Sequence, residues 1–203
     1  METPSILVPG YQEYDYSIII VPHEELRHKI TDARAVFNEK YKTTFPVLSR
    51  PAITLATFRQ IRLMEERIVN RLHIIAMSYH SFKVELKDFG SFPSHSVFIN
   101  VTSKLPVQDL VKTIRHDAQR LMKLDADNKP HFIIEPYILI ARKLLPWQYE
   151  KGWLEYSHKH FTSRFIADNM LLLRRPAGEF KYAVVQRFEF MNLPVTTKQG
   201  ELF

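Results

Sequence analysis

"RPAITLAT", residues 50–57, is a short β-branched and apolar run of the kind that forms a strand. A second stretch, "EPYILIARKL" at residues 135–144, has the same layout. Residues two apart in a strand point to the same face, so Ala52 should lie beside Thr54, and Tyr137 beside Leu139. Ala52 carries no reactive group, although a strand motif of this kind would place a chemically active side chain there.

The elements around these two stretches predict an α+β protein. Strands alternate with helices in two rounds, but hairpin-like neighbours also occur, which favours two similar lobes over a doubly wound parallel sheet. The strands are predicted at 16–21, 52–58, 80–92, 95–103, 131–144 with a kink at Pro136, 163–175 and 179–190. The helices are predicted at 23–41, with Leu26, Ile30, Ala33 and Phe37 inward, and at 64–76, 106–124 and 147–159.

Composition narrows the class of protein. The 203 residues, 45% of them apolar, suit one bilobal domain over residues 1–203, with flexible ends expected at 1–15 and 193–203. The absence of cysteine excludes disulfides, thiolate zinc sites and cysteine nucleophiles. A formal charge of +6 modestly favours polyanionic partners. Neither a signal peptide nor a membrane-spanning run is apparent, so a cytoplasmic location is expected, without membrane association.

The strand and helix order resembles the two-histidine phosphoesterase superfamily, which includes 2′-5′ RNA ligase-like proteins and cyclic phosphodiesterases. The stretches that carry the resemblance, between Tyr16 and Phe190, are "YSIIIVP", "RPAITLATF", "FKVELKDFGSFP", "HSVFINV" and "FIIEPYILIARKL". The resemblance implies a bilobal, pseudo-twofold fold with a central cleft between two antiparallel-rich sheets. Each lobe of such a protein contributes one His-x-Thr/Ser-x motif to that cleft.

The chemistry that the resemblance implies needs no metal or cofactor. One imidazole takes a proton from the attacking hydroxyl, the other gives a proton to the leaving oxygen, and the hydroxyls hold phosphate oxygens.

Three of the four motif positions are substituted in this chain. The first motif falls on Ala52 and Thr54, and the second on Tyr137 and Leu139, so only the threonine remains. Alanine cannot titrate, and tyrosine, with an ordinary pKa of about 10, is a poor proton shuttle near neutral pH. The sequence therefore predicts a catalytically degenerate member that binds RNA ends or nucleotide phosphates.

The expected ligand contacts are Thr54, Tyr137, Arg142 and His95. Strand alternation turns Arg142 away from Tyr137 unless a bulge intervenes. His95 fails as a shifted motif because Val97, not a hydroxyl residue, stands two positions later. Basic and aromatic residues also interleave over 141–153, a pattern that suits single-stranded nucleic acid but equally a helix anchored to a sheet.

Two alternatives remain open at this level. The chain could be an active phosphoesterase or RNA ligase-like enzyme that uses non-standard residues, or an interaction module whose cleft is filled. For the first, His131 is too far along its strand to replace Tyr137, and His158 with His160 is a weak metal pair without a third ligand. The pair Arg174 and Arg175 at a strand end is consistent with either phosphate binding or a solvated surface.

Overall fold

The computed structural model describes residues 10–193, which fold into two antiparallel sheets. The first sheet has the order β5-β2-β1-β8-β9 and the second has the order β6-β4-β3-β7. The strands of the first are β1 (Glu13–Ile20), β2 (Ile53–Ile61), β5 (His131–Phe132), β8 (Asn169–Pro176) and β9 (Ala183–Glu189). Those of the second are β3 (Phe82–Phe92), β4 (Ser96–Val101), β6 (Tyr137–Ala141) and β7 (Thr162–Ala167). The predicted α+β class is confirmed.

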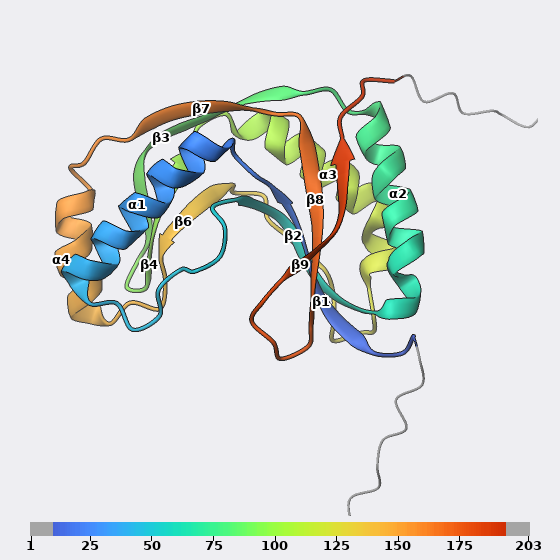
Figure 1. Ribbon diagram of the computed structural model, residues 1–203, viewed down its shortest axis with the longest axis horizontal. Coiled ribbons are helices and arrows are strands. Elements are labelled where there is room, and N and C mark those ends of the chain that lie inside the picture. Colours follow the sequence, from blue (N-terminus) through green and yellow to red (C-terminus); the bar gives the residue numbers. More distant parts are fainter. Residues whose placement is uncertain (1–9, 194–203) are drawn as a thin grey trace, which may run out of the picture.

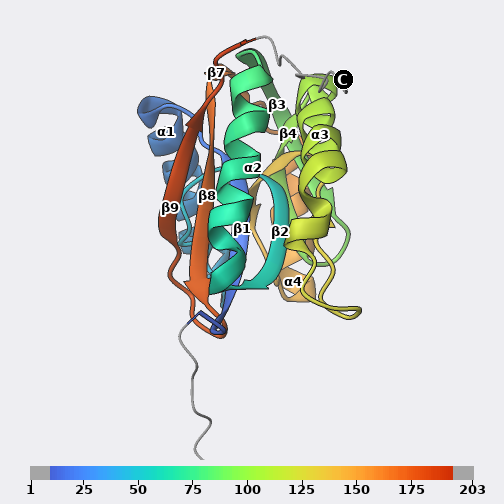
Figure 2. The ribbon, with the colours of Figure 1, turned by 90° about the vertical axis from the view of Figure 1, so that its right-hand side faces the viewer.

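Helices flank the strands on two sides. They are α1 (Glu24–Tyr41), α2 (Glu65–Ser78) after the short 3₁₀ helix η1 (Arg62–Met64), α3 (Lys104–Met122) and α4 (Pro146–Tyr156). Helices α1 and α4 lie on one side of the molecule and α2 and α3 on the other (Figure 1). Figure 2 shows α2 and α3 side by side, with the strands of the first sheet beside them. Within residues 10–193, no helix is long and apolar enough to cross a membrane.

The buried apolar side chains form one cluster that includes both sheets. Helix α1 enters it through a stripe at helical spacing, in which Leu26, Ile30 and Phe37 are fully or almost fully buried. Ala33, which was expected in the same stripe, is only half-buried. Gln148 of α4 connects the helices by donating hydrogen bonds to the carbonyl oxygens of Tyr41 and Lys42 at the end of α1. The helix pair is thereby fixed beside the second sheet.

Two predicted strands are wrong because each is really two strands in different sheets. Residues 131–144 divide into β5, which pairs with β2, and β6, which pairs with β4. Residues 163–175 divide into β7 and β8, with Asp168 between them. The apolar pattern is interrupted at both crossings, at 135–136 and at 168–169, but each interruption is as short as a kink within one strand, so periodicity alone did not reveal a change of sheet. The chain thus passes from one sheet to the other at 133–136 and at Asp168.

Smaller differences concern the ends of elements. Helix α4 stops at Tyr156, three residues before the predicted end. Strand β1 begins at Glu13, and Asp15 pairs with Arg59 of β2, so the expected N-terminal end is shorter than residues 1–15. The rest of that end, residues 1–9, and residues 194–203 of the C-terminal end lie outside the described residues.

An ion cluster between α1 and α4 predicts an acid-sensitive contribution to stability. Glu155 lies 2.7 Å from Lys159 and 2.6 Å from Lys40, and it accepts a hydrogen bond from Tyr41. Hydrogen bonds from Lys159, and then from Lys40 and Tyr41, lower the pKa of Glu155 to about 2. Because this pKa is depressed in the folded protein, the contribution is complete above the unfolded value of about 4.3 and is lost as pH falls towards 2.

Glu155→Gln should therefore lower the free energy of unfolding at pH 7 by about 1 kcal/mol, a value reduced for solvent screening, and should cause a much smaller loss near pH 2, where Glu155 is already about half protonated. Urea unfolding at both pH values measures this difference. Glu150→Gln is the matched control, since Glu150 is an exposed carboxylate of the same helix. An equal loss at both pH values would contradict the assignment.

Candidate functional site

The predicted motif positions lie on two strands that approach each other from different sheets. Thr54 is in β2 with Ala52 just before it, Tyr137 and Leu139 are in β6, and the two strands are in contact. All four side chains are partly exposed. Their neighbours in the sequence, such as Ile53 and Ile138, are completely buried. Strand alternation therefore turns each motif pair towards one face, which we call the motif face.

Both motif strands carry a one-residue bulge at the same place. In β2 the register with β1 shifts so that Thr54 and Ala56 have partners and Leu55 is the extra residue. In β6 the register with β4 shifts between Leu139 and Ala141, and Ile140 is the extra residue. A bulge re-aims the side chains that follow it. The two stretches "AITLAT" and "YILIAR" therefore match in local backbone irregularity as well as in layout.

The bulge in β6 decides the direction of Arg142. Ala141 pairs with Val97, and both side chains are buried. Arg142 follows the end of β6 and is exposed, and alternation continued by one residue would place it on the opposite side, the side of Phe98 and Leu139. The bulge on which the expected direction of Arg142 depends is therefore present in β6.

Tyr137 belongs to an aromatic cluster. Its ring centroid lies 5.0 Å from that of Phe98 and 5.2 Å from that of Phe92, in tilted and edge-on arrangements. The His95 ring stacks on Phe92 at 6.0 Å, and its Nδ1 lies 2.9 Å from the carbonyl oxygen of Pro93. Burial raises the pKa of Tyr137 above its ordinary value. Proton transfer by this tyrosine near neutral pH is therefore even less favourable than for a free one.

Gly90 makes room for the cluster. It pairs with Phe98, and a Cβ at Gly90 would lie 2.5 Å from both the Phe98 ring and Oδ1 of Asn100. The Phe98 ring can approach the backbone of β3 this closely because Gly90 has no side chain. Asn100 in turn pairs with Tyr137 across β4 and β6.

His131, His158 and His160 do not join the motif positions. His131 is in β5 of the first sheet, whereas Tyr137 is in the second sheet. His158 contacts the carbonyl oxygen of Leu154, and His160 contacts Asp88 at 3.3 Å. Among residues 10–193 there is no group of three or more histidine or acidic side chains placed to hold a metal ion.

The sequence that contains the two motif strands matches a known protein family. The model of a family described as the 2′-5′ RNA ligase superfamily matches residues 22–179, which include both motif strands. The chain belongs to the 2′-5′ RNA ligase superfamily. No curated protein matches the sequence of this superfamily member.

Solved structures agree with the fold. Escherichia coli LigT, in a crystal structure with 3′-AMP, has a TM-score of 0.61 at 15% identity, covering 88% of this chain and 98% of LigT. TT0787 of Thermus thermophilus has a TM-score of 0.63 at 17% identity, covering 87% of this chain and 98% of the other. A crystal structure described as a phosphoesterase has a TM-score of 0.60 at 17% identity, covering 88% and 98%. At these low identities, the similarity to the solved structures shows only that the fold is shared.

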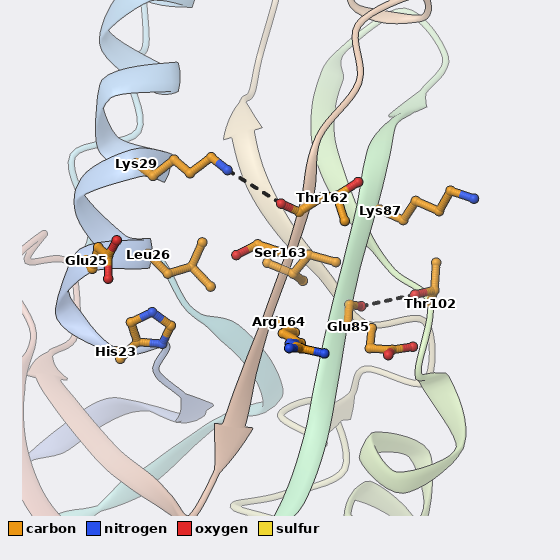
Figure 3. A pocket seen from close by; sticks show the side chains of 11 residues that line it. His23, Glu25, Leu26, Lys29, Glu85, Lys87, Thr102, Thr162, Ser163 and Arg164 are labelled. Carbon is orange, nitrogen blue, oxygen red and sulfur yellow. Dashed lines mark hydrogen bonds between the residues drawn. The ribbon is translucent and has the colours of Figure 1, made fainter.

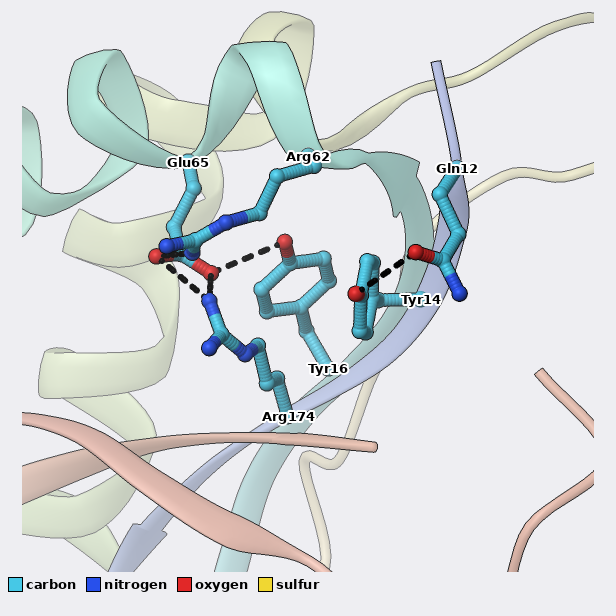
Figure 4. A network of polar contacts seen from close by, with 6 residues as sticks. All are labelled: Gln12, Tyr14, Tyr16, Arg62, Glu65 and Arg174. Atoms are coloured by element: carbon cyan, nitrogen blue, oxygen red, sulfur yellow. Dashed lines mark hydrogen bonds and ion pairs between the residues drawn. The ribbon is translucent and has the colours of Figure 1, made fainter. Parts of the chain in front are cut away.

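The adjacent Arg174 and Arg175 of the superfamily member are not a pair that binds one phosphate, because they point to opposite faces of β8. Arg174 donates to both oxygens of Glu65, at 3.0 Å and 2.8 Å, and Glu65 also pairs with Arg62. Tyr16 donates to the same carboxylate at 3.1 Å. Figure 4 shows the three side chains converging on Glu65. Burial raises the pKa of Tyr16 to about 12, so it remains a neutral donor.

Arg175 lies on the other face, which is the face of Thr54. It contacts Asp15 at 3.2 Å, and Arg59 contacts the same carboxylate at 2.9 Å. The guanidinium also lies over the ring of Tyr182 at 4.7 Å. Its Nε is buried without a hydrogen-bond partner. Both expectations for this arginine pair, phosphate binding and a solvated surface, are replaced by two intramolecular ion networks.

The residues of 141–153 are divided between surface and core. Trp147 is exposed, whereas Trp153 and Tyr149 pack against the core cluster. Tyr149 is also hydrogen-bonded to Ser91 of β3 at 2.9 Å. The helix-anchoring interpretation therefore accounts for Tyr149 and Trp153.

Sequence analysis missed Arg34. This side chain is 4% exposed and occupies the core stripe of α1, between Ile30 and Phe37. Its Nε donates to the carbonyl oxygen of Leu139 at 2.9 Å, and its Nη1 donates to that of Ser49 at 2.6 Å. Arg34 thus holds the second motif strand and the segment that leads into the first. The signal in the sequence was a charged residue at an apolar position of the helical repeat.

Two pockets of the superfamily member lie along α1. One, of about 610 Å³, lies between the start of α1 and the edge strand β7. Figure 3 shows basic and acidic side chains mixed around it, with Lys29 donating to the carbonyl oxygen of Thr162. The other, of about 600 Å³, lies between α1 and residues 47–51 and includes Arg34. Neither pocket is lined by Ala52, Thr54, Tyr137 or Leu139.

Proposed function

We propose that this superfamily member is a catalytically degenerate phosphoesterase that binds RNA ends or nucleotide phosphates on the motif face. The observation that carries the proposal is the matched geometry of the two motif strands, with a bulge after each motif, combined with the loss of both proton-transfer groups. A backbone suited to the motif is retained, while Ala52 and Tyr137 stand at the histidine positions.

The side chains that remain suit binding. Thr54 offers a partly exposed hydroxyl for a phosphate oxygen, and Arg142 offers a guanidinium that is exposed on the same side as Leu139. The partly exposed rings of Phe92, Phe98 and Tyr137 offer apolar faces on which a base can stack. The 3′-AMP in the LigT crystal structure supports a nucleotide as the ligand class.

The exposure of these residues favours binding over the filled interaction module. A filled site would bury the side chains at 52, 54, 137 and 139, but all four are partly exposed. The enzyme alternative requires a histidine pair at one bound phosphate. His95 stands next to the aromatic cluster, but the described contacts bring no second histidine to it.

Titration with 3′-AMP, followed by NMR, tests the proposed site directly. We expect shifts of the Thr54 and Tyr137 backbone amide resonances. Loss of one charge-assisted hydrogen bond, in Thr54→Val or in Arg142→Gln, should weaken the binding at these resonances about tenfold. Arg115→Gln, an exposed arginine of α3, is the matched control and should leave the affinity unchanged.

If 3′-AMP at millimolar concentration shifts neither amide, the motif face is not a nucleotide site. Equal affinity in Arg142→Gln and the unchanged protein would remove Arg142 from the site.

A further inference from the structure

Arg34 is a buried cation without an acidic partner. Both of its hydrogen bonds go to carbonyl oxygens, of Leu139 and Ser49, and no carboxylate within residues 10–193 lies within ion-pair distance. Burying a charge is unfavourable unless an opposite charge compensates it. Burial lowers the pKa of Arg34 only to about 10, so the group stays charged at neutral pH. A buried positive charge at this place therefore lacks its counter-ion in the protein itself.

The uncompensated charge faces a pocket. Arg34 lines the space of about 600 Å³ between α1 and residues 47–51. The described hydrogen bonds of Arg34 use Nε and Nη1, and no acceptor is described for Nη2. This nitrogen is a free donor at the end of a side chain that two carbonyl bonds hold in place.

Most of the other charges around the pocket have the same sign. Arg27 lies on the same stripe of α1 as Arg34, and Arg50 lies in the segment that closes the pocket. Among the described residues, neither arginine has an ion-pair partner. The one acidic side chain of the lining, Glu24, is 3.6 Å from His28. Three guanidinium groups thus share a pocket with one carboxylate.

We propose that this pocket is a second anion site, which binds a phosphate-bearing molecule of about mononucleotide size through Arg27, Arg34 and Arg50. Arginine donors suit phosphate because the planar fork can engage two oxygens at once. The volume lies in the range of small-molecule sites. Asn38, Ser49 and Thr31 supply neutral polar groups for the rest of the ligand. The pocket is not lined by the motif side chains, although Arg34 also holds the backbone of Leu139, and the proposal does not depend on the proposed function.

Titration with three probes, inorganic phosphate, 5′-AMP and adenosine, tests the proposal in the full chain. The readout is the side-chain Nε–H resonance of Arg34. We expect phosphate and AMP to shift it with saturation, and adenosine to have no effect. Arg27→Gln and Arg50→Gln should each weaken AMP binding at this resonance about tenfold. Both variants change partly or fully exposed side chains, so the fold should be retained.

Arg71→Gln is the control for charge alone, since Arg71 is exposed on α2 away from the pocket, and it should leave AMP binding unchanged. Thr54→Val and Arg142→Gln separate the two sites: they should leave the Arg34 titration intact, while Arg27→Gln and Arg50→Gln should leave the Thr54 and Tyr137 shifts intact. The proposal would be overturned if neither 10 mM phosphate nor 10 mM AMP shifted the Arg34 resonance, or if AMP and adenosine shifted it equally. An equal loss of affinity in Arg71→Gln would do the same.

Discussion

The triple variant Ala52→His, Tyr137→His, Leu139→Thr is expected to hydrolyse 2′,3′-cyclic AMP at least 100-fold faster than the unchanged protein. The variant restores the two groups that take and give a proton, each worth roughly 10²- to 10⁴-fold, and the second hydroxyl. The backbone is already arranged for them, because both motif strands have the same bulge after the motif. The gain should also have a bell-shaped pH profile, since one imidazole must be neutral while the other is protonated.

The gain is measured by incubating the purified protein with 2′,3′-cyclic AMP at pH values between 5 and 8 and quantifying the product by chromatography. The variant Ala52→Gln, Tyr137→Phe, Leu139→Val is the matched control, because it changes the same positions without adding a group that titrates in this range. Turnover by the unchanged protein that persists through purification and equals that of the histidine variant would favour the enzyme with non-standard residues. Inactivity of the histidine variant would show that the motif geometry has been lost.

Glu65→Gln is expected to have the largest effect on stability, a loss of about 2–3 kcal/mol in the free energy of unfolding, less than for a fully buried pair because Arg62 and Arg174 are 42% and 28% exposed. The carboxylate is 8% exposed and receives Arg174, Arg62 and the hydroxyl of Tyr16. A neutral amide leaves the two guanidinium groups facing each other without a negative charge. Urea unfolding at pH 7 provides the measurement.

Glu66→Gln is the control, since Glu66 is the next residue of the same helix and is exposed. Its effect should stay within 0.5 kcal/mol of zero, as for most surface substitutions. The double variant Glu65→Gln, Arg174→Met should recover part of the loss, because it removes one of the unpaired charges. A loss below 1 kcal/mol in Glu65→Gln would mean that this network contributes little to stability.

The sequence predicted the positions of most elements, because each has a periodic apolar face. The helix at 23–41 and the strand at 52–58 both follow from a regular spacing of apolar residues. The two crossings between sheets were not predicted, because the apolar pattern is interrupted only briefly, at 135–136 and at 168–169, as it would be by a kink within one strand. Pro136 at the first crossing and Asp168 at the second are local signs, but each is equally consistent with a kink in one strand.

The candidate site was predictable where it depends on strand alternation and not where it depends on distant contacts. The directions of Thr54, Tyr137 and Leu139 follow from their spacing, and the structure places all three partly exposed. The direction of Arg142 depends on a bulge whose partner strand, β4, is far away in the sequence. Likewise, the role of Arg34 could not be predicted, because its side chain donates hydrogen bonds to carbonyl oxygens at positions 49 and 139, which are distant from it in the sequence.

The division of strands between the sheets also sets the order in which the protein can assemble during synthesis. The pairs β3–β4, β4–β6 and β3–β7 all lie between Phe82 and Ala167, so the second sheet is complete before the last strands leave the ribosome. The first sheet is not, because Tyr14 of β1 pairs with Pro176 of β8. Until then β1 exposes an unpaired edge, which is the kind of edge that other chains can join. Truncation before β8 should therefore yield a chain that aggregates rather than a smaller folded protein.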